Sequence, residues 1–234
     1  TTGADNTAVG AQALDANTTA SNNTAVGGAA LGANTTGASN TAVGRTALAA
    51  NTEGHSNTAV GSNTASTVTT GDENVAIGHG AMQSMATGNN GNTAVGTDTM
   101  ADANYDGSYN TAVGYNALLQ AETISGTTAI GNQCLDALTT GDNNTAVGAG
   151  ALGAITTGAD NTAIGHSALA STNHTRNLGV GYRALTAQSG SSDNMAIGYD
   201  ALVRQTTGAN GNIAIGNYAG RAVVSSASTS QLVA

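Results

Sequence analysis

The 234-residue chain contains no proline, phenylalanine or tryptophan, and its only aromatic residues are six tyrosines. Without large rings, the interior has to be filled by Ala, Val, Ile, Leu and Thr, which predicts a thin hydrophobic core. Basic residues are also scarce, with five against fourteen acidic ones and a net charge of -9. That charge repels phosphate backbones and anionic lipid, so we expect no nucleic-acid partner.

Membrane-spanning and processing signals are missing as well. There is no run of about 18 apolar residues, and the chain begins at Thr1 with neither a signal peptide nor an initiator methionine. We therefore expect no membrane insertion by this segment and interpret it as an excised or processed piece. The single cysteine, Cys134, excludes an internal disulfide. It stands where most repeats have alanine, so we predict a small buried residue.

What the chain does contain is a repeat. The motif Asn-Thr-Ala-Val-Gly, or a close variant, occurs thirteen times at intervals of 16 to 18 residues. A unit this short becomes stable only by stacking on its neighbours, which predicts an all-β parallel β-solenoid (β-roll) of about 13 coils and a period of about 17 residues. The first motif residue, position 1, is Asn6, Asn23, Asn40, Asn57, Asn74, Asn92, Asn110, Thr127, Asn144, Asn161, Asn177, Asn194 or Asn212.

The repeat also predicts the domain limits. The solenoid is expected over residues 1–220, with a partial coil at 1–5. Residues 221–234 match no repeat position, so we expect them to leave the solenoid as a cap or junction.

Individual repeat positions predict local structure. Gly fills position 5 in every copy, which indicates a positive φ or a close backbone approach that ends a strand. Position 4 is always Val or Ile, which favours a buried strand. Position 9 is mostly apolar and suggests a second strand in each coil. Asn at position 1 is expected either to form a ladder along the solenoid or simply to suit a turn.

The short strand is constrained on both faces. Positions 2 and 4 point one way and position 3 the other, yet position 3 is always Ala or Gly, and position 2 accepts Thr, Val, Leu, Met and Ile. A strand restricted on both sides is normally covered on both sides. One cover is the interior of the coil. We expect the other to be a neighbouring copy of the chain, in a homo-oligomer.

The motifs Asn74-Val75-Ala76-Ile77-Gly78, Met195-Ala196-Ile197-Gly198 and Ile213-Ala214-Ile215-Gly216 resemble the head repeats of trimeric autotransporter adhesins of the YadA type. The commoner Asn-Thr-Ala-Val-Gly form is similar to arrays in phage tail fibres. The resemblance spans about nine-tenths of the chain. It implies a left-handed solenoid, a homotrimer and an extracellular location on a bacterial surface or a virion fibre.

The sequence lacks catalytic and metal-binding motifs. The chain has no Gly-x-Ser-x-Gly elbow, phosphate loop or converging carboxylates, so we expect no enzyme and no cofactor. His79 and His166 share a repeat position but lie five coils apart, which excludes a shared zinc ion. Turn carboxylates such as Asp72, Asp142 and Asp160 lack the calcium-roll pattern, so no metal is expected.

Tyrosines are the candidate contact residues. Tyr115, Tyr182 and Tyr199 all follow the position-5 glycine, and Tyr182 and Tyr199 lie on adjacent coils. With Arg183 they are candidates for a platform that binds a cell-surface glycan or a protein receptor. Tyr105 and Tyr109 are candidates for a second contact near Tyr115. The alternative is that these are ordinary surface or interface tyrosines.

Three functions are compatible with these observations. The first is a structural or adhesive segment of an extracellular fibre, either a trimeric adhesin head or a tail-fibre shaft. The second is an ice-binding β-solenoid, although its single Thr column is interrupted at Val75 and after Thr162. The third is a self-polymerising filament subunit, because solenoid ends expose strand edges.

Overall fold

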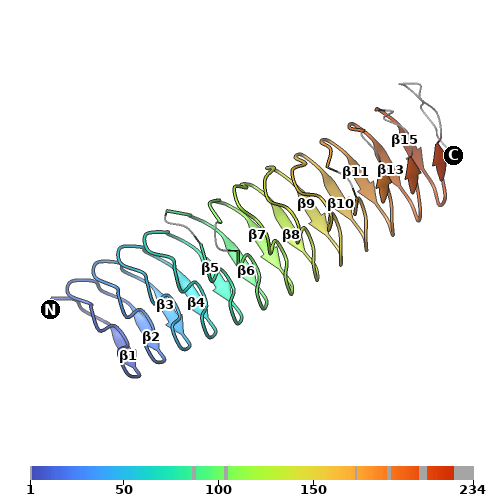
Figure 1. Cartoon of the computed structure of the whole chain (residues 1–234). Helices are drawn as coiled ribbons and strands as arrows, with labels where there is room; N and C mark the ends of the chain where they lie inside the picture. The colour runs from blue at the N-terminus through green and yellow to red at the C-terminus, as the bar shows by residue number, and fades with distance from the viewer. Residues whose placement is uncertain are drawn as a thin grey trace. The chain divides into compact units, whose positions relative to one another are not determined.

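The computed structural model describes residues 2–85, 88–102, 105–171, 173–188, 191–205 and 210–223. It divides into two compact units, Thr1–Asn116 and Ala117–Ala234. Each unit is a stack of coils joined by parallel strands, so the chain is an all-β solenoid with a period of about 17 residues. Figure 1 shows the successive coils, each contributing one short strand to the main sheet.

Seven strands of three residues form the parallel sheet of the first unit. Neighbouring strands pair in one constant register, with position 2 opposite position 2 and position 4 opposite position 4. The strands are β1 (Thr7–Val9), β2 (Thr24–Val26), β3 (Thr41–Val43), β4 (Thr58–Val60), β5 (Val75–Ile77), β6 (Thr93–Val95) and β7 (Thr111–Val113).

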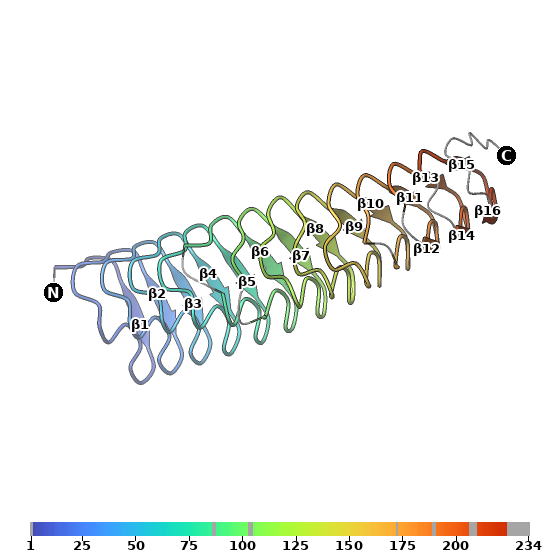
Figure 2. The same ribbon diagram turned by 45° about the horizontal axis from the view of Figure 1, so that its top comes forward.

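Six strands of the same kind form the main sheet of the second unit, again parallel and in constant register. They are β8 (Thr128–Ile130), β9 (Thr145–Val147), β10 (Thr162–Ile164), β11 (Leu178–Val180), β13 (Met195–Ile197) and β15 (Ile213–Ile215). A smaller parallel sheet, drawn in red in Figure 2, contains β12 (Ala187–Gln188), β14 (Arg204–Gln205) and β16 (Ala222–Val223). The thirteen repeats therefore give thirteen main strands and about 11 complete turns.

Glycine at position 5 ends each main strand, as predicted. All thirteen of these glycines have a positive φ, between 129° and 142°. A Cβ on Gly44, for example, would lie 2.2 Å from the carbonyl oxygen of Gly61 in the next coil. Both the backbone angle and the close coil spacing therefore require glycine at this position.

The prediction of a buried position 4 is wrong. Alanine at position 3 fills the interior, and Ala25, Ala42 and Ala59 are fully buried. Across the thin coil, a Cβ on Gly179 would lie 3.1 Å from Leu169, a position-9 leucine. Because side chains alternate along a strand, positions 2 and 4 then point outward, and Val43 and Ile77 are exposed. Only small side chains fit between the strand and the position-9 leucine.

The predicted second strand at position 9 is also wrong. Position 9 has a left-handed φ in all thirteen repeats, as at Leu48 (49°) and Leu118 (52°), and position 7 does too, as at Thr46 (56°). A strand residue cannot adopt this angle, which costs a non-glycine residue roughly 1–2 kcal/mol. Backbone hydrogen bonds between coils hold the turn, since Leu48 donates to the carbonyl of Thr64 in the next coil.

Position 1 forms a ladder, which is the first of the two alternatives expected from the sequence. The side-chain oxygen of Asn57 accepts a hydrogen bond from the backbone N–H of Asn74 at 2.9 Å, and its amide nitrogen donates to the carbonyl of Gly71 at 2.7 Å. The same contacts recur along both units, for example between Asn177 and Asn194. These side chains are almost completely buried. Each asparagine therefore satisfies backbone groups of the next coil that would otherwise lack partners.

A second asparagine ladder occupies position 12 in the first coils. Asn51 donates its amide to the side-chain oxygen of Asn34 at 2.8 Å. The next coil has Val68 at this position, and the side-chain oxygen of Asn51 is left buried without a hydrogen-bond partner. Further along, Leu138 and Ile155 fill position 12 with apolar side chains. The asparagine ladder at position 12 thus ends between Asn51 and Val68.

The predicted departure from the repeat at residue 221 lies too early. Ala222 and Val223 of β16 pair in register with Arg204 and Gln205 of β14, so residues 221–223 still follow the coil. The remainder of the predicted cap, residues 224–234, lies outside the described residues.

The ladder generates a stability prediction. Asn57→Ala leaves the carbonyl of Gly71 and the N–H of Asn74 unpaired inside the coil, and each such group costs about 1–3 kcal/mol. We expect urea unfolding to show a loss of roughly 2–5 kcal/mol. The control Asn132→Ala, on an exposed turn, should change stability by about 0.5 kcal/mol or less. Equal losses for the two variants would refute the ladder's role.

The left-handed turns generate a second prediction. Ser39 is exposed with φ of 62°, and Gly91, Gly126 and Gly211 occupy the same repeat position elsewhere. Ser39→Val places a β-branched side chain at this angle and should lower the unfolding free energy by about 1–3 kcal/mol. Ser39→Gly should be neutral or slightly stabilising. Thermal melts of both variants check this, and a harmless valine would contradict it.

Candidate interaction surface

Positions 2 and 4 of the main strands form one continuous surface in each unit, here called the outer strand face. Its β-branched residues are only partly covered, and Val43, Ile77 and Ile215 are 37% to 44% exposed. Position 2 is half-buried in every main strand after β1. The chain's own coil fills the other side of each strand. A sheet face that is largely apolar, with Thr at position 2 of most strands, is therefore left open toward solvent in both units.

The composition of this face changes in the second unit. Position 2 is Thr in nine of the first ten main strands, the exception being Val75, and becomes Leu178, Met195 and Ile213 in β11, β13 and β15. Position 4 in the same strands is Val180, Ile197 and Ile215. Over these three strands the outer face has lost every hydroxyl group. It is the most apolar part of the surface that the strands present.

An aromatic ladder, formed by His166, Tyr182, Tyr199 and Tyr218, follows the carboxyl ends of these strands. The rings of His166 and Tyr182 are stacked with centroids 5.5 Å apart, and those of Tyr182 and Tyr199 are stacked at 5.0 Å. Tyr218 meets Tyr199 edge-on at 5.3 Å. The three tyrosines are 40% to 51% exposed. One ring from each successive coil thus builds a row along the edge of the outer strand face.

The geometry of this ladder limits what it can bind. Tyr182 has one ring stacked on each of its faces, and the guanidinium of Arg183 lies 5.9 Å from its centroid. Arg221 lies 5.3 Å from the centroid of Tyr218. Since ring faces are already used within the chain, a partner meets mainly ring edges and hydroxyl groups. A flat sugar platform built from the faces of Tyr182 and Tyr199 is not what the structure forms.

Arg183 also pairs with an unusual carboxylate. Asp200 is only 4% exposed, and its Oδ1 lies 3.6 Å from the Nε of Arg183 without a hydrogen-bond partner. Partial desolvation, followed by the charge of Asp200, raises the pKa of the Tyr199 hydroxyl. That hydroxyl therefore stays protonated at neutral pH and can donate as well as accept a hydrogen bond.

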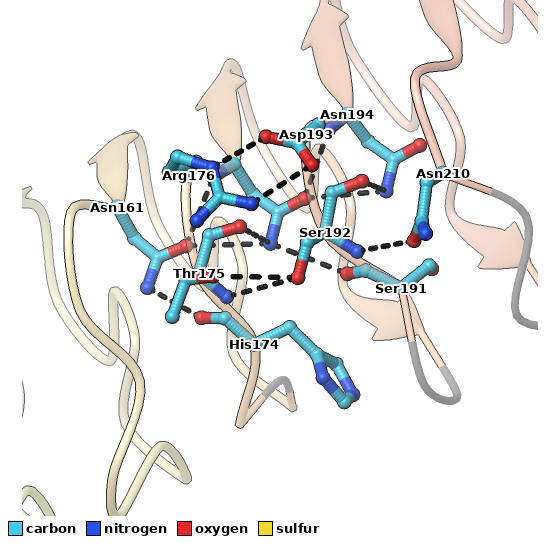
Figure 3. Close-up of polar contacts among 10 residues, drawn as sticks. Asn161, His174, Thr175, Arg176, Ser191, Ser192, Asp193, Asn194 and Asn210 are labelled. Atoms are coloured by element: carbon cyan, nitrogen blue, oxygen red, sulfur yellow. Dashed lines mark hydrogen bonds and ion pairs between the residues drawn. The ribbon is translucent and has the colours of Figure 1, made fainter.

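An ion pair lies at the amino ends of the same strands. Arg176 contacts Asp193 in the next coil with Nε to Oδ1 at 2.6 Å and a second nitrogen to Oδ2 at 3.1 Å, as Figure 3 shows. The hydrogen bond from Arg176 lowers the pKa of the Asp193 carboxyl, and the same contact raises the pKa of Arg176. The pair therefore persists at neutral pH and is lost only as the pH falls through the lowered pKa of Asp193.

Hydrogen bonds between coils hold this edge in place. The N–H of Ser192 donates to the side-chain oxygen of Asn210 at 2.8 Å, and the amide of Asn161 donates to the carbonyl of His174 at 2.7 Å. Figure 3 shows these contacts around Arg176 and Asp193. The ion pair is consequently carried by three adjacent, mutually bonded coils. The ion pair borders the apolar strands at their amino ends, whereas the aromatic ladder borders them at their carboxyl ends.

The predicted contact residues divide into three groups. Tyr182, Arg183 and Tyr199 do lie together. Tyr109 and Tyr115 are exposed in the first unit, and Tyr109 covers Gly91. Tyr105 is wrong as a contact residue because it is fully buried, with its hydroxyl bonded to Asn92 and Asn110. Burial raises the pKa of Tyr105 well above its usual range.

Sequence reasoning missed four residues of this surface: His166, Arg176, Asp193 and Tyr218. Aligning the repeats places His166 at the same position as Tyr182 and Tyr199, so the ladder was detectable from spacing. Arg176 and Asp193 likewise share a position on adjacent coils. Tyr218 occupies the following position, and only the turn geometry brings its ring to the ladder.

Three further predictions concern Cys134, metal binding and membrane insertion. Cys134 is fully buried, and burial raises the pKa of its thiol to about 12, as expected for an inert core residue. Within the described residues, no three His, Cys, Asp or Glu side chains come together as a possible metal site. The described part of the chain also contains no helix with the length and apolarity needed to cross a membrane.

Comparisons of the chain with family models, with curated proteins and with solved structures produced no match in any of the three.

The aromatic ladder generates a testable prediction. Tyr182→Ser removes a ring that is stacked on both sides, and each aromatic pair contributes about 0.5–1.5 kcal/mol. The second unit should therefore lose roughly 1–3 kcal/mol in denaturant unfolding. Tyr115 is the matched control, because the neighbouring repeats have Thr97 and Asn132 at this position. If Tyr115→Ser is as costly as Tyr182→Ser, stacking is not the cause.

Proposed function

We propose that this chain is a structural and adhesive segment of an extracellular fibre, in which three copies associate through the outer strand face. The observation that carries the proposal is the open apolar face, which the chain's own coils leave uncovered in both units. The repeat's resemblance to adhesin-head and tail-fibre arrays supports the trimeric state and a place on a bacterial surface or a virion.

The size of the face supports association. Strands about 10 Å long and about 4.8 Å apart give roughly 350 Å² of sheet in the seven-strand unit and roughly 300 Å² in the other. The largest apolar patch on a typical monomer covers about 300–600 Å² and often marks a binding site. Side chains no larger than Thr, Val and Ile cover most of the outer strand face, so three such faces can approach a common axis closely. Association of three copies through their outer strand faces removes the side chains of these faces from water.

The adhesive part of the proposal concerns the exposed aromatic residues. Tyr109 and Tyr115 in the first unit, and Tyr182, Arg183 and Tyr199 in the second, are candidates for contact with a receptor or glycan. They lie on turns outside the strands, where side chains vary between repeats while positions 3, 4 and 5 stay nearly constant. A fibre built on a constant core can change its contacts at such turns without changing its fold.

Ice binding is the second candidate, and one observation favours it. The Thr residues of position 2 point outward at the regular spacing of the coils, as in the neighbouring strands Thr24–Val26 and Thr41–Val43. Val and Ile share this face, so it presents one hydroxyl column instead of two. A monomeric chain that produced thermal hysteresis in freezing solutions would favour this function over the fibre.

Sedimentation equilibrium tests the fibre proposal. We expect a species of three times the chain mass of 22.5 kDa at micromolar concentration. Val60→Glu places a charge on the outer strand face and should dissociate it. Thr19→Glu is the control, since Thr19 is exposed and Glu53 occupies the same repeat position. A stable 22.5 kDa monomer overturns the proposal, and an open-ended mass series would indicate a self-polymerising filament.

A further inference from the structure

We propose that β11, β13 and β15, bordered by the aromatic ladder, form the dominant self-association patch, and that this patch binds the same patch on a second copy of the chain. The inference rests on the proposed function and deepens it. It identifies which part of the outer strand face controls association. It also assigns Tyr182 and Tyr199 to the interface between copies, in place of the receptor or glycan contact for which they are candidates above.

The first argument is the change at position 2. In nine of the first ten main strands this position is Thr, whose hydroxyl has to be desolvated when the face is covered. Leu178, Met195 and Ile213 remove that cost and add aliphatic surface to be buried. Burial of this surface therefore favours association more strongly over these three strands than over any earlier three.

The second argument is the chemistry of the border. Tyrosine, methionine and arginine are the residue types enriched where protein interfaces derive most of their affinity. Stacking already fixes Tyr182 and Tyr199 in position, so little rotational freedom remains to be lost on binding. Their faces are occupied and their edges and hydroxyls are open, which suits a protein surface better than the flat face of a sugar.

The third argument is charge. Residues 1–160 contain twelve acidic residues and one arginine, whereas residues 161–234 contain two aspartates and four arginines. Both of those aspartates are paired at the patch, Asp193 with Arg176 and Asp200 with Arg183. These two ion pairs are neutral, and Arg204 and Arg221 add only two positive charges, against the strongly acidic residues 1–160. Two copies therefore repel each other much less at the patch than along their acidic parts.

The size of the patch agrees with a second copy as the partner. Three strands supply roughly 150 Å² of sheet, and the exposed parts of three tyrosines add roughly 250 Å². Each partner contributes about 800 Å² to a standard interface, so the patch provides about half of that area. The other strands of the outer face supply the remainder, while the patch determines the affinity.

The test converts the patch to the consensus repeat. The triple variant Leu178→Thr/Met195→Thr/Ile213→Thr gives each strand the residue that most others already have, so folding should be retained, as far-UV circular dichroism would show. We expect sedimentation equilibrium to show association weakened about 10- to 100-fold. The matched control, Thr128→Ser/Thr145→Ser/Thr162→Ser, should change association less than about threefold.

Two further measurements sharpen the test. Tyr182→Ser/Tyr199→Ser should weaken association by a similar factor without dissociating the coils. Raising NaCl from low to high concentration should strengthen association of the unmodified chain, because salt screens repulsion between the acidic parts and leaves apolar contact intact.

The outcomes separate this inference from the proposed function. If the unmodified chain associates and the consensus variant associates equally well, the patch inference is overturned and the fibre proposal stands. If the unmodified chain is monomeric, both fail. A monomer whose migration is retarded in a gel containing a soluble neutral glucan, and restored by Tyr182→Ser/Tyr199→Ser, would make the ladder a glycan site.

Discussion

Hydrogen bonding between successive coils is the interaction on which the structure depends. The backbone N–H of Thr24 reaches the carbonyl of Asn40 in the next coil, and that of Gly27 reaches Val9 in the previous one. The buried asparagine ladder fills the gap where the chain turns into each strand. A coil separated from its neighbours would keep almost none of these bonds. A single repeat therefore cannot fold without adjacent coils.

This constraint explains the unusual turns. Positions 7 and 9 adopt left-handed backbone angles even for leucine and aspartate, as at Leu48 and Asp200. The strain is tolerated because it aims N–H and carbonyl groups along the stack, where adjacent coils satisfy them. The same turn folds Leu48 into the coil against alanine. A narrow interior of Ala and Leu is thus a consequence of the hydrogen-bonding pattern, and it leaves Val and Ile outside.

Much of the fold could be predicted from sequence because its spacing is regular. The motif interval located every main strand, glycine located every strand end, and Asn57 and its equivalents predicted a ladder as one of two alternatives. What failed were inferences from residue preference alone. Val43 was predicted as a core residue and Leu48 as a strand residue. The space inside the coil determines where both side chains lie, and the geometry of the left-handed turn sets that space. Tyr105 was misplaced because nothing in its local sequence marks burial.

The surface chemistry of the chain varies only where the sequence departs from the repeat, since a uniform solenoid presents the same surface everywhere. In the second unit three kinds of departure coincide: apolar residues at position 2, rings at positions 6 and 7, and paired charges next to the strands. Their concentration on β11, β13 and β15 gives one region a different chemistry from the rest. In the proposed assembly, a chain that is acidic elsewhere has one surface on which its copies meet, and a few side chains on that surface control association.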